Sequence, residues 1–379
     1  MRMELGKSLL NQHRCTARWF CRSFSHFLSG AAERSFGIAF DIDGVLLLGE
    51  KTVGGSPRAL QRLFHPSGQL AIPFILLTNG GGVRESERAV ELSHRLDVKL
   101  LPLQIVQGHA PFKQLLSRFK DDLIIAVGKG KPADVMRGYG YRNVLSIDEY
   151  TSYFDEIDPL AKYKSWTTGE TVHTSSLNEG KDKIEAIHSQ SVKAAFVVSD
   201  SVDWSRDIQV LCDILSSGGL PGRGFGSQPD LYFANDDLSY QATFPVERLG
   251  MGAFRIALES VYNSINPKPL EYTSFGKPNP RVFSNAEAVL FKLASSRIDN
   301  GNSTSNRFKT LYMVGDNPYV DIKGAKQAGH PWYSILTRTG VFKGKGNHPE
   351  FPADMVTNHI TRGHYAKSWT RWKMLWSIF

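Results

Sequence analysis

Hydrophobic residues gather in short runs, each of which ends in acidic, amide or hydroxyl side chains. Three such runs lie at 36–43 (FGIAFDID), 73–79 (PFILLTN) and 310–316 (TLYMVGD). Short apolar runs bounded by turn residues are typical of strands that a parallel sheet buries on both faces. Helical patterns follow or separate them, at residues 57–64, 84–96, 110–119, 280–294 and 320–328. The alternation predicts an α/β fold with a parallel sheet.

A second set of the same kind lies inside the first. Its apolar runs predict strands at 123–127, 194–198 and 230–234, and helical patterns cover 133–138, 206–216 and 252–262. We therefore expect one core domain built from residues 36–119 and 271–357, with residues 120–270 inserted as a second α/β domain.

The first 35 residues have the composition of an organellar presequence. They hold six Lys and Arg residues, repeated serines and only two acids, Glu4 and Glu33. Arginine-rich, serine-rich and acid-poor segments are typical of transit peptides, and the excess of arginine favours mitochondria, most simply the matrix. The alternative is a basic tail without a targeting role.

The other end of the chain, residues 358–379, carries a tryptophan stripe. Trp369, Trp372 and Trp376 follow the i, i+3, i+7 spacing of one helix face. A terminal helix that docks on the core explains this pattern, and so does a peripheral helix that rests on an anionic membrane, since lysine and arginine residues flank the stripe. Both interpretations stay open.

Charge and composition limit the kinds of partner that we expect the chain to bind. The net charge is +8, but residues 1–35 and 362–379 account for all of it, so the body of the chain is neutral and predicts no nucleic-acid partner. No run of 18 apolar residues occurs, which argues against a transmembrane helix. The three cysteines (Cys15, Cys21 and Cys212) form neither a disulfide framework nor a thiolate metal site.

The candidate chemistry lies where the three outer strands end. Because parallel strands bring their carboxyl ends to one sheet edge, the side chains there should gather. These residues are Asp41, Asp43, Thr78, Asn79, Asp316 and, five residues further on, Asp321. Several carboxylates at one point repel one another unless a cation neutralises them, and an all-oxygen ligand set favours Mg²⁺. With Lys277 and Thr78 as donors, such a site suits a transferring phosphoryl group.

Four segments resemble, in order, the motifs of the haloacid dehalogenase (HAD) superfamily: FDIDGVL, LLTN, FGKPNP and GDNPYVDI. The length of the insertion between the second and third resembles the cap of class IIA, NagD-like phosphatases. The segments VSDSVDWSRDIQVLCDIL, FANDD and RLGMGAFRIALESVY are similar to the mitochondrial cat eye syndrome critical region protein 5 family. The resemblance implies a Rossmann-like, doubly wound core with an inserted α/β cap domain.

The same resemblance implies a role for each matching residue. Asp41 would be the nucleophile that forms an aspartyl-phosphate, and Asp43 the general acid and base. Thr78, Asn79 and Lys277 would bind the phosphoryl oxygens. Because Asp43 is present, we expect a phosphatase rather than a dehalogenase or a transport ATPase. A phosphomutase is the remaining alternative within the superfamily, and the size of the α/β cap argues against it. The alternative is a catalytically silent protein that binds a phosphate ligand or acts as a scaffold.

The resemblance also implies a metal site and a substrate. Mg²⁺ would be bound by Asp41, the backbone carbonyl of Asp43, Asp316 and Asp321. The cap would close over a small phosphorylated metabolite, and the tail leaves a link to glycerophospholipids open. We further expect a homodimer through the cap.

In the cap, Asp203, Arg206 and Asn235 are the polar residues that we expect to contact substrate. Two of them have a structural alternative: Asp203 suits the N-cap of the helix predicted at 206–216, and Arg206 its solvent face.

Overall fold

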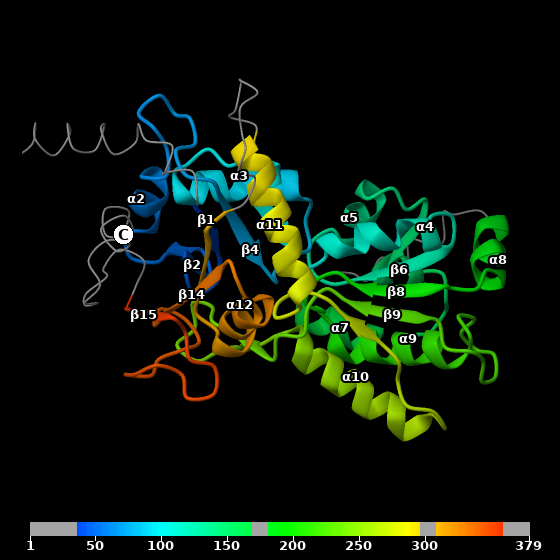
Figure 1. Ribbon diagram of the computed structural model, residues 1–379. Helices are drawn as coiled ribbons and strands as arrows, with labels where there is room; N and C mark the ends of the chain where they lie inside the picture. The colour runs from blue at the N-terminus through cyan, green and yellow to red at the C-terminus, as the bar shows by residue number, and fades with distance from the viewer. Residues whose placement is uncertain (1–35, 169–180, 296–307, 359–379) are drawn as a thin grey trace, which may run out of the picture.

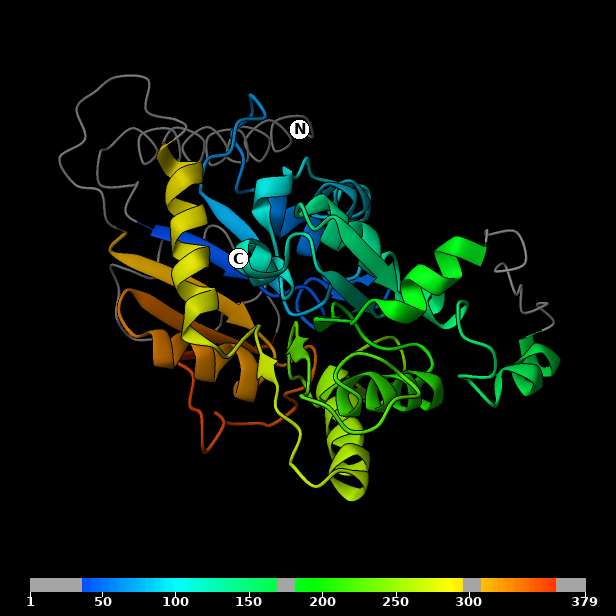
Figure 2. The same ribbon diagram turned by 90° about the vertical axis from the view of Figure 1, so that its right-hand side faces the viewer.

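The computed structural model describes residues 36–168, 181–295 and 308–358. The expected presequence and the tryptophan stripe of the tail lie outside these residues. Figures 1 and 2 show a core and a cap, each an α/β unit, standing side by side. Among the described residues, the structure contains no helix with the length and hydrophobicity needed to cross a membrane.

The core is built on a six-stranded sheet in which every pairing is parallel. The three predicted outer strands are its centre: β1 lies between β13 and β4. The sheet order is β15 (Met355–Thr357), β14 (Trp332–Thr337), β13 (Thr310–Gly315), β1 (Phe36–Phe40), β4 (Phe74–Thr78) and β5 (Ile105–Gln107).

Helices cover both faces of this sheet. On one face α2 (Ser56–Gln61) and α3 (Glu85–Leu96) pack against alternate strand residues such as Phe40 and Leu76. On the other, α11 (Pro280–Ser295) and α12 (Lys323–Ala328) pack against the residues between them, such as Ala39 and Leu77. This alternation follows from the two-residue period of a strand, and it confirms the doubly wound core.

The cap has a five-stranded sheet of its own, also parallel throughout. Its order is β12 (Thr273–Ser274), β9 (Asp230–Phe233), β8 (Ala194–Val197), β6 (Leu123–Val127) and β7 (Asn143–Ser146). The cap helices include α5 (Pro132–Gly138), α6 (Ile147–Thr151), α7 (Ala161–Thr168), α8 (Lys181–Ser189), α9 (Trp204–Ser216) and α10 (Met251–Ile265). The inserted α/β cap is thus confirmed, while the boundaries at 120 and 270 stay predictions; β12 joins the cap sheet just beyond 270.

Short elements link the two units. A 3-10 helix, η3 (Ala110–Leu115), continues into α4 (Leu116–Phe119) on the way into the cap. A small hairpin of β10 (Ser239–Tyr240) and β11 (Arg248–Leu249) extends from the cap, and the turn between them reaches the core, where Thr243 Oγ1 donates to Leu48 O. Leu48 belongs to the hairpin β2 (Leu47–Leu48) and β3 (Lys51–Thr52). The remaining elements are η2 (Pro102–Gln104) and the π-turn η5 (Pro318–Ile322).

Candidate active site

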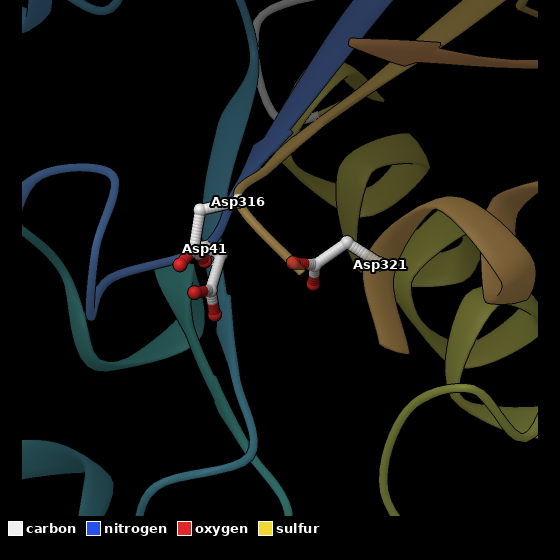
Figure 3. A group of neighbouring side chains, drawn as sticks. All are labelled: Asp41, Asp316 and Asp321. Carbon is white, nitrogen blue, oxygen red and sulfur yellow. The ribbon is translucent and has the colours of Figure 1, made fainter. Parts of the chain in front are cut away.

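Three predicted carboxylates meet where the strand order of the core sheet reverses. Asp41 follows β1, Asp316 follows β13, and Asp321 lies in η5. One carboxylate oxygen of each lies within 4.8 Å of those of the other two, and all three residues are buried. Figure 3 shows the three side chains pointing toward one another. A reversal of strand order opens a crevice at the carboxyl edge of a parallel sheet, which is where ligands bind in such folds.

Backbone groups hold the carboxylates in place. Asp316 Oδ2 accepts a hydrogen bond from Val341 N at 2.6 Å, and Asp321 Oδ2 accepts one from Asn317 N at 3.0 Å. Asp316 needs two glycines beside it: a Cβ on Gly340 would lie 1.8 Å from Asp316 Oδ2, and one on Gly44 would lie 2.3 Å away. Gly44 also has a φ of +86°, which other residues rarely adopt.

The Lys277 side chain contacts two of the three carboxylates. Its Nζ donates to Asp41 Oδ1 at 2.6 Å, Asp321 Oδ1 at 2.7 Å and Leu77 O at 2.9 Å, which uses all three ammonium hydrogens. The side chain is buried, and although burial alone would lower the pKa of Lys277, the two aspartates raise it overall. Lys277 therefore remains charged at physiological pH.

One lysine does not balance three buried carboxylates. Burial, and then the neighbouring Asp321, raises the pKa of Asp316 to about 8. Burial also raises the pKa of Asp41 well above its ordinary value, against the opposing charge of Lys277. A buried, all-oxygen cluster with excess negative charge has the donor set that a hard divalent cation requires, so these residues fit Mg²⁺.

Asp43 and Thr78 lie beside the loop that follows β4. A Cβ on Gly80 would be 3.6 Å from Asp43 Oδ2 and 3.2 Å from Thr78 Oγ1, so both flank the loop that follows β4. Thr78 Oγ1 accepts a hydrogen bond from Gly80 N at 2.9 Å. Burial raises the pKa of Asp43, while Arg88 and Lys129 oppose the increase. A raised carboxyl pKa favours the protonated form that a general acid needs.

The Asn79 amide is already bonded within the site. Its Oδ1 accepts from Lys277 N at 2.7 Å, and its Nδ2 donates to Lys277 O at 3.0 Å and to Asp237 Oδ1 at 2.8 Å. Asn79 thus fixes the backbone of the lysine, and phosphate binding by Asn79 stays a prediction.

The three cap residues that were predicted to contact substrate have different surroundings in the structure. Asn235 reaches the core, where its Nδ2 donates to Asn79 O at 2.9 Å. Asp203 is the N-cap of α9, accepting from Arg206 N at 3.2 Å, and it pairs with Lys164. Arg206 pairs with Asp207 at 2.7 Å and with Asp148. Substrate contact by Asp203 and Arg206 stays a prediction, beside the structural roles that the geometry shows.

Sequence reasoning missed polar residues that the cap brings to the site. Asp237 bonds Asn79, and Lys129 forms an ion pair with Asp200 at 2.8 Å. Asp237, Lys129 and Asp200 lie two to four positions beyond the ends of the cap strands β9, β6 and β8. The strand-end rule applied to the core could have found them in the cap as well.

A doubly wound core with an inserted α/β cap and a carboxylate cluster at the reversal of strand order defines a capped hydrolase fold. Family models agree: "Haloacid dehalogenase-like hydrolase" matches residues 38–142, and an HAD-hydrolase-like model matches residues 274–362. "Mitochondrial hydrolase YKR070W" of Saccharomyces cerevisiae is 33% identical over 347 residues, covering 86% of this chain and 94% of the yeast protein. The chain therefore belongs to the HAD-like hydrolases.

A second relative is a fusion protein that is longer than the region it shares with this chain. The "Cardiolipin synthase (CMP-forming) / mitochondrial hydrolase fusion protein" of Schizosaccharomyces pombe is 34% identical over 334 residues, covering 86% of this chain. The match spans 52% of the fusion protein. Similarity to this protein thus concerns about half of its length.

Solved structures share the fold at low identity. A possible sugar phosphatase of Cytophaga hutchinsonii has a TM-score of 0.58 at 17% identity, with 88% of this chain and 96% of that chain covered. NagD of E. coli has a TM-score of 0.51 at 16% identity, with coverages of 85% and 96%. The glycerol phosphate phosphatase Rv1692 of Mycobacterium tuberculosis, in complex with magnesium, has a TM-score of 0.52 at 18% identity, with coverages of 87% and 76%.

Proposed function

We propose that the chain is a Mg²⁺-dependent phosphatase that hydrolyses a small phosphomonoester through an aspartyl-phosphate. The observation that carries this proposal is the meeting of Asp41, Asp316 and Asp321 within 4.8 Å, with Lys277 Nζ bonded to Asp41 and Asp321. Such an arrangement offers a nucleophile, a cation site and a fixed positive charge at one point, as phosphoryl transfer requires.

The chain's own residues supply two displacement steps. In the first, an Asp41 oxygen bonds to phosphorus while the phosphorus–oxygen bond to the alcohol breaks, and Asp43 gives its proton to the leaving alkoxide. In the second, Asp43 takes a proton from water as the water oxygen bonds to phosphorus, which releases Asp41 and inorganic phosphate. Lys277 holds one oxygen of Asp41 and thereby orients the other.

We assign the cation to the carboxylates of Asp41, Asp316 and Asp321, which lie within 4.8 Å of one another, and to the backbone carbonyl of Asp43, which the resemblance to HAD hydrolases implies. When bound, Mg²⁺ supplies positive charge that offsets these carboxylates and the phosphoryl oxygens. The Thr78 hydroxyl, which accepts from Gly80 N, still has its own hydrogen to donate to a phosphoryl oxygen, and the Lys277 ammonium adds positive charge beside it.

The names of the two relatives support a proposal for the location of the protein in the cell and for the class of its substrate. Both carry "mitochondrial hydrolase" in their names, and one is fused to a cardiolipin synthase. We place the chain in mitochondria, in the matrix, directed by residues 1–35, and propose a link to glycerophospholipid metabolism. Dimerisation through the cap and membrane contact through residues 358–379 belong to the same hypothesis.

The test uses the full-length chain and an aryl phosphate. With Mg²⁺ the wild type should release phosphate, and with a chelator it should not. Asp41→Asn should lower kcat by at least about 1,000-fold because the nucleophile is lost. Asp121→Asn is the matched control: Asp121 is exposed and pairs with Arg142 at 2.9 Å, so its loss should leave turnover unchanged.

Equal rates for wild type and Asp41→Asn would overturn the proposal. If phosphate binding were retained in that case, the chain would be a binding protein that uses the same pocket without turnover.

A further inference from the structure

The carboxyl edge of the cap sheet faces the carboxyl edge of the core sheet. Strands β6 and β8 are adjacent and parallel, so the chain leaves both at one edge, and Lys129 and Asp200 follow there. At this edge Lys131 N donates to Gly82 O at 2.7 Å. The cap edge therefore lies on the loop 79–82 that follows β4. Two parallel sheets thus direct the edges where ligands bind toward the same space.

Only the turn at residues 80–82 separates this cap edge from the proposed general acid. A Cβ on Gly80 would lie 3.6 Å from Asp43 Oδ2, and one on Gly82 would lie 2.4 Å from Lys129 O. A Cβ on Gly82 would also lie 2.9 Å from Ser199 Oγ, so the segment that carries Asp200 lies beside the same turn. The leaving group, which Asp43 must reach, therefore points toward Lys129 and Asp200.

The side chains of Lys129 and Asp200 form an ion pair that is partly exposed to solvent. Lys129 Nζ lies 2.8 Å from Asp200 Oδ2, and the two side chains are 50% and 30% exposed. The Tyr240 ring lies on one side, with its centroid 5.8 Å from Nζ. Each group retains hydrogen-bonding capacity, because an ammonium has three donors and a carboxylate has several acceptor positions.

This chemistry matches hydroxyl groups. A neutral pair with both donors and acceptors can satisfy several hydroxyls, which themselves donate and accept. An apolar leaving group would cover the pair without replacing its water, which is costly. The pair requires no charge on the leaving group, because its own charges cancel.

We propose that Lys129 and Asp200 form the leaving-group subsite and select phosphomonoesters of hydroxyl-rich alcohols over esters of apolar alcohols. This inference rests on the proposed phosphatase function. It replaces Asp203 and Arg206, whose partners lie within the cap, as the first residues to test for selectivity.

The test compares glycerol phosphate with propyl phosphate, which have equal numbers of carbons and differ in two hydroxyls. For the wild type we expect kcat/KM to favour glycerol phosphate by about 10- to 100-fold. Lys129→Met and Asp200→Ala should each reduce that ratio about 10-fold. Using the ratio of two alkyl esters cancels any change in the acidity of Asp43. Lys131→Met, which removes an exposed lysine two positions away that pairs with Glu87, should keep the wild-type ratio.

A wild-type ratio near one, or a ratio that neither variant changes, would overturn the subsite. Thermal unfolding checks that the variants fold; if neither does, the wild-type ratio decides. If the chain hydrolyses no phosphate ester, the proposed function fails, and calorimetric binding of the two esters then tests the subsite, with equal affinities overturning it.

The hydroxyl-rich phosphomonoester could be a free metabolite or the head group of a lipid. Vesicles that carry a lipid whose head group ends in glycerol phosphate provide the third substrate. Faster turnover of the vesicle lipid than of free glycerol phosphate would support the subsite and assign it to a head group, and the reverse would support it and assign it to a free ester. A loss of either turnover that is equal for Lys129→Met and Lys131→Met would contradict it.

Discussion

Glycines around Asp316 show how tightly single residues define this site. The Asp316 carboxylate fits between Gly44 and Gly340, and no larger residue could stand at either position without moving it. Shifting a ligand by about 1 Å can cost about 100-fold in rate, because a site must hold its groups in the reacting geometry. The glycines therefore belong to the chemistry as much as the acids do.

Gly340→Ala should lower phosphatase kcat/KM by about 100-fold or more, since its Cβ would lie 1.8 Å from Asp316 Oδ2. Gly346→Ala provides a control in the same loop region, because a Cβ there would meet no atom within 4 Å. Steady-state kinetics with an aryl phosphate measures both. Equal activity of the two variants would show that Asp316 tolerates displacement.

Asp237 is a positioning residue by its contacts. It holds Asn79 Nδ2 at 2.8 Å, and Asn79 holds the backbone of Lys277. Asp237→Ala should lower kcat about 10-fold, the effect expected when a hydrogen bond to a charged group is lost. Asp237→Asn keeps an acceptor oxygen and should restore most of kcat. If the Asn variant were as slow as the Ala variant, a role through Asn79 would be excluded.

At the scale of elements, a buried chain of side chains joins the core to the cap. His109 Nδ1 lies 2.6 Å from the hydroxyl of Tyr139, the residue that directly follows α5, and that hydroxyl donates to Glu85 in α3 at 2.8 Å. Because the Tyr139 proton points to Glu85, His109 Nδ1 carries the proton of the other bond. Burial lowers the pKa of His109 from 6.5 to about 4. The histidine is therefore neutral in the folded protein.

This histidine gives a pH dependence of known sign. Between pH 4 and 6.5 the unfolded chain binds a proton at His109 that the folded chain does not. Stability from this group is thus complete above pH 6.5 and is lost as the pH falls toward 4, by up to about 3 kcal/mol. His109→Asn should flatten the free energy of unfolding over this range, as measured by urea titration. The exposed His94 in α3 provides the control: His94→Asn should retain the wild-type slope.

For the molecule as a whole, the sequence predicts the strands whose pattern lies within one short segment of the chain. The strands that carry Asp41, Thr78 and Asp316 were found because each is an apolar run that ends in a polar group. Strands β5, β14 and β15 were missed. A neighbouring strand decides the place of β5 and β15, which have three residues each at the sheet edges, whereas the six residues of β14 (WYSILT) form a pattern that the sequence could have revealed. Short edge strands carry little pattern of their own.

The residues of the candidate site show the same difference between those that the sequence predicts and those that it does not. The core acids and Lys277 could be predicted to gather because parallel strands end at one edge. The same rule points to Lys129, Asp200 and Asp237 as residues at cap strand ends, but it could not place them beside the core site, because that depends on which edge of the cap faces the core. Asp203 was weighed as a substrate contact or a helix cap, and its bond to Arg206 N at 3.2 Å shows that it caps α9.

If the buried carboxylates form a cation site, the stability of Asp316→Asn should show it. Without Mg²⁺ this variant should be at least as stable as the wild type, because one of three clustered buried charges is gone. At about 100 times the dissociation constant, Mg²⁺ should stabilise the wild type by about 2.7 kcal/mol and the variant far less. A wild type that gains no stability from Mg²⁺, or a variant that gains as much as the wild type, would contradict the account.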